Sequence, residues 1–144
     1  MTGSSFSRHS IVARPEGGTV VSVAIRDHEV RTDQPARLGG TDTAPSPLEL
    51  MGASLSGCVA LYVQKFCDGA GVDATDLVVE VRPVWREEPG RIGRFDVVLH
   101  LPESIAAEHH AAIERVARTC PVHHTLAFAP EVTFELRVPE VAAV

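Results

Sequence analysis

The chain has 144 residues, a length that suits a single domain over residues 1–144. Hydrophobic residues make up 44% of it and charged residues 22%, which excludes disordered, collagen-like and coiled-coil proteins. The net charge of −6 would repel phosphate backbones, so we expect no nucleic acid partner. We also expect no contact with a membrane, because no apolar run approaches the length of a membrane span.

The first 45 residues are typical of β structure with turns. Residues 1–10 contain no apolar stretch after a basic start, so we expect no secretory signal. Residues 20–26 and 29–32 predict a hairpin closed around Asp27 and His28. Residues 38–47 are rich in Gly, Thr, Asp and Pro, which indicates a loop.

A long helix is predicted over residues 47–68. Ser46 is a suitable N-cap, Pro47 suits the first helical position, and Glu49 completes a capping box. Gly69 and Gly71 mark the end of the helix. At 1.5 Å per residue the helix would be about 33 Å long.

This helix is apolar on every side. Between residues 50 and 66 the only charged side chain is Lys65. A helix of that kind is buried on all sides, and a domain of this size has difficulty covering it alone. We therefore predict a homodimer in which the two copies share their core.

The rest of the chain predicts two further strands, two helices and a last strand. Residues 77–82 and 94–101 alternate in polarity and flank Pro89-Gly90, which indicates a hairpin with one buried face. A helix should follow over residues 104–119, a short helix over 121–127 and a strand over 132–138. The order of strands, helix, strands, helices and strand indicates the α+β class.

Three cysteines carry the possible chemistry: Cys58, Cys67 and Cys120. An odd number without a signal peptide argues against a disulfide framework and for a reducing, cytoplasmic location. Cys58 lies in mid-helix, where the plain interpretation is a small core residue. Cys67 lies at the end of the helix, and we assign it no role.

Cys120 precedes Pro121 at a predicted helix start. A thiol at an N-cap faces free backbone N–H groups, which lower its pKa, so the local sequence favours Cys120 as the thiolate. Cys120 and His123 also have the spacing of a metal-binding pair, to which His124 and Cys58 could add ligands. Without a second paired unit we expect neither a metal ion nor another cofactor.

Three segments share their order and spacing with one known family. They are Leu-Gly-Gly at 38–40 leading to Pro-Ser-Pro-Leu-Glu-Leu at 45–50, the small-residue helix from 51 to Cys58, and Cys-Pro-Val-His-His-Thr-Leu at 120–126. The chain resembles the OsmC/Ohr family over residues 11–138. The resemblance implies an OsmC-like fold, a β-sheet packed around a long buried central helix, and an intertwined homodimer with two sites at the interface.

The resemblance also implies an activity. In the peroxidase members a thiolate attacks an organic hydroperoxide, a second cysteine forms a disulfide with the product, and a dithiol reductant restores both. By position, Cys58 would be the peroxidatic cysteine and Cys120 the resolving one, in defence against oxidative stress. We follow the family in preferring Cys58, because an Arg from another segment can activate a thiol that no helix end assists.

The activating pair of the family differs in this chain. The peroxidase members pair a Glu early in the helix with an Arg from the N-terminal β region, and the Glu position is Leu48 here. Glu49 would lie on the face opposite Cys58. Arg14 and Arg26 are the candidates for the Arg.

Two functions therefore stay open. The first is a thiol-dependent peroxidase that reduces organic hydroperoxides through Cys58 and Cys120. The second is a non-catalytic OsmC-like module that binds a small apolar ligand or electrophile, with thiols that do not cycle.

Overall fold

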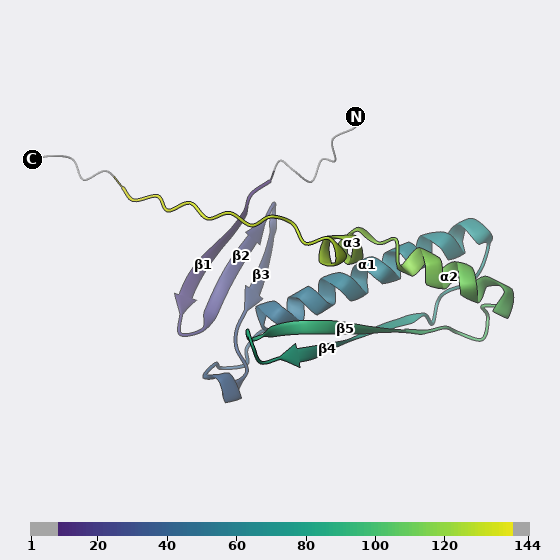
Figure 1. The fold of residues 1–144 in the computed structure, drawn as a ribbon, viewed down its shortest axis with the longest axis horizontal. Coiled ribbons are helices and arrows are strands. Elements are labelled where there is room, and N and C mark those ends of the chain that lie inside the picture. Colours follow the sequence, from purple (N-terminus) through teal and green to yellow (C-terminus); the bar gives the residue numbers. More distant parts are fainter. Residues whose placement is uncertain (1–8, 140–144) are drawn as a thin grey trace, which may run out of the picture.

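The computed structural model describes residues 9–139 as two small β-sheets and a set of helices (Figure 1). This mixture confirms the α+β class. Residues 1–8 lie outside the described residues. They include most of the N-terminal segment in which we expected no secretory signal.

The N-terminal sheet has three antiparallel strands in the order β1-β2-β3. They are β1 (Ile11–Gly17), β2 (Val20–Ile25) and β3 (His28–Thr32). The predicted hairpin is confirmed, with its turn one residue earlier than expected, since Ile25 pairs with His28. Arg26 in that turn has a φ of 55°.

The loop before the long helix is organised by a buried carboxylate that the sequence did not reveal. Asp33 is 0% exposed. It accepts hydrogen bonds from the hydroxyls of Thr19, Thr41 and Thr43 and from the backbone N–H groups of Gln34, Thr41 and Thr43. These bonds hold the pKa of Asp33 well below its usual range, with those from Thr19 and Thr41 contributing most.

Helix α1 (Pro47–Ala70) spans 24 residues. Its capping box is confirmed, because the backbone N–H of Ser46 donates to Glu49 Oε2 at 2.7 Å and the N–H of Glu49 donates to Ser46 Oγ at 3.3 Å. The helix continues two residues past the predicted end and stops at Gly71, whose φ of 67° suits glycine.

Only one stripe of α1 is buried in the single chain. Leu55, Val59, Val63 and Cys67 recur every fourth residue and form it. The expected burial on all sides is wrong for one copy, because β4, α2 and α3, which contact the helix, leave much of its surface uncovered. Leu61 is 50% exposed on the open side.

Helix α1 is also long and apolar enough to cross a membrane, judged by length and composition alone. An 18-residue window within it has a mean hydropathy of 1.2, and it is the only such helix among residues 9–139. The expectation that no segment reaches that length is therefore wrong. The Gly, Ala and Ser residues of α1 shorten each uninterrupted run of large apolar side chains, but they do not make the helix polar as a whole.

Strands β4 (Val78–Arg86) and β5 (Arg91–His100) form the predicted antiparallel hairpin. Both strands continue further toward the turn than expected, and a bulge between Val84 and Trp85 interrupts the register. The inner face of the hairpin packs on α1, where the Phe95 ring and Val81 lie close to Gly52.

The next predicted helix begins later than expected. A 3-10 turn, η3 (Ala107–His109), leads into α2 (His110–Ala117). Ser104 does not cap it, because its hydroxyl donates to the carbonyl of Asp73 at 3.0 Å. The short helix α3 (Pro121–Ala127) lies where it was predicted.

The predicted strand over residues 132–138 is wrong for the single chain. These residues are extended and pair with no strand in the described part of the chain. The segment leaves α3 and runs past the β1–β3 sheet without joining it (Figure 1). Its apolar alternation is intact, but no strand edge lies beside it.

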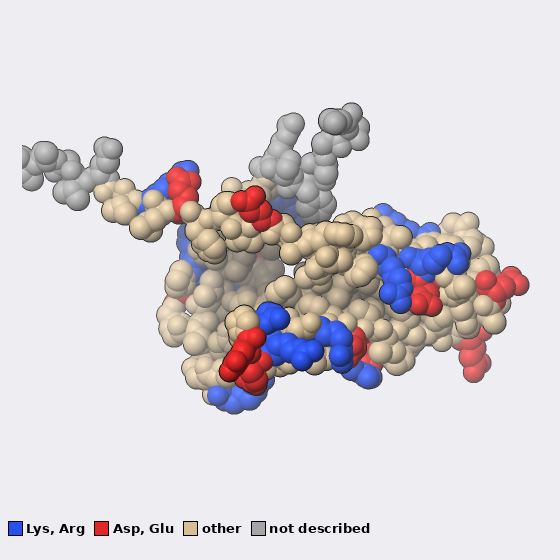
Figure 2. Space-filling model, viewed as in Figure 1, with Lys and Arg blue, Asp and Glu red and all other residues tan. Residues whose placement is uncertain are grey.

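Charged side chains of both signs adjoin one another on the face shown in Figure 2, and much of that face is uncharged. Several are paired along a strand, such as Arg94 with Asp96 at 2.8 Å and Arg82 with Glu80 at 2.6 Å. Exposed pairs of this kind contribute little to stability.

Candidate functional site

The two cysteines singled out by the resemblance meet in the fold. Cys58 lies on α1 between the buried residues Leu55 and Val59, and Cys120 is the N-cap of α3. The Cys58 side chain lies against the Cys120 sulfur, close enough to act on its ionisation. Both cysteines are free thiols. Packing of α3 on α1 therefore joins two thiols that are far apart along the chain.

The prediction that Cys120 caps a helix is confirmed, but the prediction of a lowered pKa is wrong. The backbone N–H of His123 donates to Cys120 Sγ at 3.2 Å, as the N-cap position requires. Burial nevertheless raises the pKa of Cys120, because Cys120 is 0% exposed and its thiolate would lose water. The neighbouring Cys58 raises that pKa further.

Solvent access separates the two thiols. Cys58 is half-buried, whereas Cys120 is fully buried. A small molecule arriving from solvent can therefore reach Cys58 before Cys120. This difference in access agrees with the resemblance, which implied Cys58 as the peroxidatic and Cys120 as the resolving cysteine. It disagrees with the local sequence, which favoured Cys120 as the attacking thiolate.

Cys67 belongs to the core rather than to a frayed helix end. It is 0% exposed, and burial raises the pKa of its thiol. Gly71 and Val72 both donate backbone hydrogen bonds to its carbonyl, so the end of the helix is well ordered. The structure places no second thiol beside Cys67.

No cation pairs with Cys58 among residues 9–139. Arg14 lies on β1 and Arg26 in the β2–β3 turn, and neither has a hydrogen bond or an ion pair with a cysteine. Glu49 is engaged in the capping box, and Leu48 is exposed at the surface. The family's activating pair is therefore not assembled within the described part of one chain.

His123 supports the turn that carries Cys120. Its Nδ1 lies 2.7 Å from the carbonyl of Arg118, which fixes the ring through an Nδ1–H donor. The sequence suggested His123 only as a metal ligand. Within the described residues no group of three or more His, Cys, Asp or Glu side chains could hold a metal ion.

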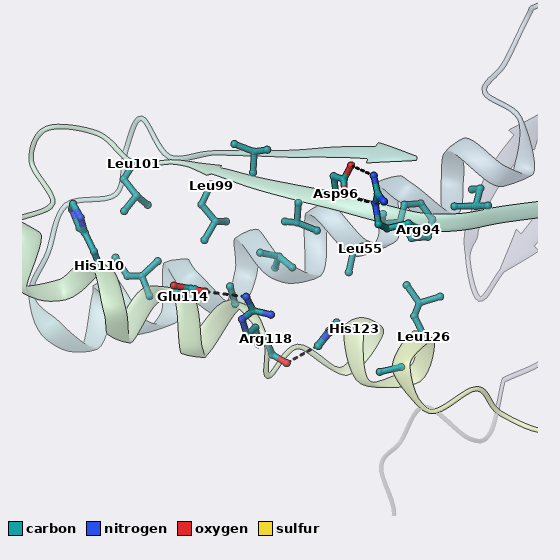
Figure 3. Close-up of a pocket in the computed structure, with 18 of the residues that line it drawn as sticks. Leu55, Arg94, Asp96, Leu99, Leu101, His110, Glu114, Arg118, His123 and Leu126 are labelled. Atoms are coloured by element: carbon teal, nitrogen blue, oxygen red, sulfur yellow. Dashed lines mark hydrogen bonds and ion pairs between the residues drawn. The ribbon is translucent and has the colours of Figure 1, made fainter. Parts of the chain in front are cut away.

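A cavity of about 850 Å³ lies between β5, α1, α2 and α3 (Figure 3). Leu55, Leu99 and Leu101 point toward it, while Arg94 with Asp96 and Arg118 with Glu114 form ion pairs at its rim. Neither Cys58 nor Cys120 lines it, although Leu55 and Val59, which flank Cys58 in α1, do.

The arrangement can form one disulfide. Cys58 is reachable from solvent and lies in contact with Cys120, which is buried and remains protonated. This arrangement allows an oxidant to oxidise the Cys58 sulfur and the Cys120 thiol then to condense with it.

Comparison with known proteins agrees with this fold. The family model described as OsmC-like protein matches residues 40–135. A comparison with curated proteins returned no match. Among solved structures, a protein of Psychrobacter arcticus 273-4 provisionally named an osmotic stress induced and detoxification response protein has a TM-score of 0.73 at 21% identity, covering 80% of this chain and 85% of that one.

Two further structures carry hydroperoxide resistance in their names. The OsmC-like hydroperoxide resistance protein of Jannaschia sp. CCS1 is 28% identical with a TM-score of 0.57, and the match covers 91% of this chain and 93% of that one. The organic hydroperoxide resistance protein OsmC of Legionella pneumophila is 19% identical with a TM-score of 0.55, covering 83% and 90%.

Proposed function

The chain belongs to the OsmC-like family, and from that premise we propose that it is a thiol-dependent peroxidase that reduces organic hydroperoxides in defence against oxidative stress. The contact between Cys58 and Cys120 carries the proposal. The names of the related hydroperoxide resistance proteins support it.

In the first step the Cys58 thiolate attacks the terminal oxygen of the hydroperoxide. An S–O bond forms, the O–O bond breaks, and two electrons pass from sulfur to the peroxide. The alcohol leaves after its oxygen takes a proton from water, and Cys58 becomes a sulfenic acid. The apolar neighbours of Cys58 on α1 favour an organic hydroperoxide over hydrogen peroxide.

In the second step the Cys120 thiol condenses with the sulfenic acid. A disulfide forms, and the oxygen of the sulfenic acid leaves as water with the proton of Cys120. The N–H of His123 holds the Cys120 sulfur in place for this attack. A dithiol reductant then restores both thiols by exchange, as a reducing cytoplasm would allow.

The test is the mass of the intact protein after one equivalent of an organic hydroperoxide. We expect the loss of two hydrogens and a peptide crosslink between Cys58 and Cys120. Cys58→Ser should abolish both the mass change and turnover, whereas Cys120→Ser should stop at a sulfenic acid that a dimedone probe captures. Cys67→Ser is the matched control and should behave as the wild type. Unchanged turnover in Cys58→Ser would refute the proposal.

A second function is favoured by one observation. No cation pairs with Cys58 among the described residues, so a thiol that does not cycle is the alternative, in a module that binds a small apolar ligand or electrophile. Unmodified masses at both cysteines after peroxide, together with binding of an apolar fluorescent probe, would favour that function.

A further inference from the structure

Cys120 lies in the short link between α2 and α3. Helix α2 ends at Ala117 and α3 begins at Pro121, so residues 118–120 alone form the link. Both helices pack on α1 rather than on each other. The direction of the Cys120 side chain therefore depends on the hydrogen bonds that hold the link itself.

His123 holds this link through two different groups. Its backbone N–H donates to Cys120 Sγ at 3.2 Å. Its ring reaches back past the cysteine, where Nδ1 lies 2.7 Å from the carbonyl oxygen of Arg118, the C-cap of α2 (Figure 3). A carbonyl oxygen only accepts, so Nδ1 is the donor. The ring therefore closes residues 118–123 into a loop around the sulfur.

No second hydrogen bond duplicates the one from the ring. The hydroxyl of Thr119 donates to the carbonyl of Val116 at 2.7 Å, which ties the link to α2 alone. The hydroxyl of Thr125 donates to the carbonyl of Pro121 at 2.8 Å, which is a contact within α3. Among the side-chain hydrogen bonds in the described part of the chain, only the one from the His123 ring joins α3 to the end of α2.

The two hydrogen bonds of His123 also differ in their relation to the chemistry. Its N–H points at the Cys120 sulfur, which is itself changed when it condenses with Cys58. Its ring points at a backbone carbonyl, which takes no part in the reaction. The ring bond can therefore hold the link while the sulfur changes from a thiol to a disulfide.

We propose that His123, through its ring, is a positioning residue for the resolving step of the proposed peroxidase, the function on which this inference rests. The ring keeps the Cys120 sulfur directed at Cys58, so the sulfenic acid condenses before a second hydroperoxide reaches it. In the competing reaction the sulfenic acid attacks a second hydroperoxide, an S–O bond forms, the O–O bond breaks, and an alcohol leaves. The product is a sulfinic acid, which a dithiol does not restore.

The first test compares two amides that differ by one methylene group. The Asn side chain places an N–H donor close to the position of Nδ1, whereas the Gln side chain places it close to that of Nε2. We expect His123→Gln to slow the conversion of sulfenic acid to disulfide about tenfold or more, and His123→Asn to stay within about threefold of the wild type. The first oxidation of Cys58 should be equally fast in all three proteins. Quenched-flow mass spectrometry after one equivalent of an organic hydroperoxide measures both rates.

His124→Gln makes the same change at the exposed neighbouring residue, and this control should resolve at the wild-type rate. In excess hydroperoxide, His123→Gln should accumulate sulfinic acid, detected as a gain of two oxygens, about tenfold more per turnover than the wild type. Equal resolving rates in the wild type and His123→Gln overturn the positioning role, as does an Asn variant as slow as the Gln variant. A wild type that forms no disulfide refutes the proposed function itself, and this inference with it.

A measurement on the unaltered protein does not depend on how the variants fold. The nitrogen NMR shifts of the His123 ring report which ring nitrogen carries the proton. We expect a protonated Nδ1 in both the reduced and the disulfide form, because the acceptor is a carbonyl in each. A ring protonated only at Nε2 in either form overturns the proposal.

Discussion

Asp33 accepts hydrogen bonds from both polar groups of Thr43, from the backbone N–H at 3.0 Å and from the hydroxyl at 2.9 Å. Together with the bonds from Thr41, these contacts fix the loop that ends at Ser46, the N-cap of α1. The carboxylate therefore connects the end of β3 to the start of the helix that carries Cys58.

Asp33→Asn should destabilise the protein, because an amide presents N–H donors to groups that are themselves donors. We expect the midpoint of thermal unfolding at pH 7 to fall by about 5 °C or more. Asp42→Asn makes the same change of charge at an exposed position in the same loop and should have little effect. Equal midpoints for the two variants would contradict this role of Asp33.

The contribution of Asp33 should also depend on pH. The fold lowers its pKa, so the stabilisation is complete above the unfolded value of about 4 and is lost as the pH falls toward the lower folded value. The difference in unfolding midpoint between wild type and Asp33→Asn should therefore shrink between pH 5 and pH 2, where scans at several pH values can follow it. A constant difference would disprove this linkage.

Ser46→Ala should remove one side of the capping box and cost about 1 kcal/mol of unfolding free energy. Chemical denaturation measures this change. Ser54→Ala replaces an exposed serine inside the same helix and serves as the control, with an expected change within about 0.5 kcal/mol. A Ser46→Ala variant as stable as the control would show that the cap is dispensable.

Gly40→Ala should destabilise the loop, because a Cβ at that position would overlap the backbone carbonyl of Gln34. We expect a loss of about 1–3 kcal/mol. Gly69→Ala is the matched substitution in α1, where nothing lies within 4 Å of the added carbon, and it should gain about 0.5–1 kcal/mol. Denaturant titration of both variants should give changes of opposite sign, and a common sign would refute the prediction.

In the reduced native protein, Cys58 should react with iodoacetamide at least about tenfold faster than Cys120 or Cys67, since the latter two are fully buried with raised pKa values. Peptide mapping after timed quenching measures each rate. Unfolding in urea should make the three rates similar. Faster labelling of Cys120 in the native state would reverse the assigned roles.

Local signals in the sequence predicted the elements that local chemistry determines. Ser46 and Glu49 marked the start of α1, and Pro89-Gly90 marked the turn between β4 and β5. The partial burial of α1 and the absence of a partner strand for residues 132–138 among the described residues could not be predicted in the same way, because both depend on which surfaces lie nearby. The apolar pattern indicates that a side chain needs cover, and it does not say which element supplies that cover.

The site was predictable in part. The resemblance identified Cys58 and Cys120, and the fold places their side chains next to each other. Reasoning from the helix end alone gave the wrong direction for the pKa of Cys120, because desolvation outweighs two hydrogen bonds from backbone N–H groups. Asp33 was missed because its partners come from separate segments and share no sequence motif.

The burial of Cys67 limits which oxidised forms the protein can reach. Three thiols allow three different pairs, but nine residues of α1 separate Cys67 from Cys58, about 14 Å along the helix axis. A disulfide cannot span that distance, so Cys58 cannot pair with Cys67 in the native chain, whereas Cys120 lies beside Cys58. Oxidation that begins at Cys58 therefore leads to a single covalent isomer within one native chain, and a reductant meets one disulfide rather than a mixture of mispaired forms.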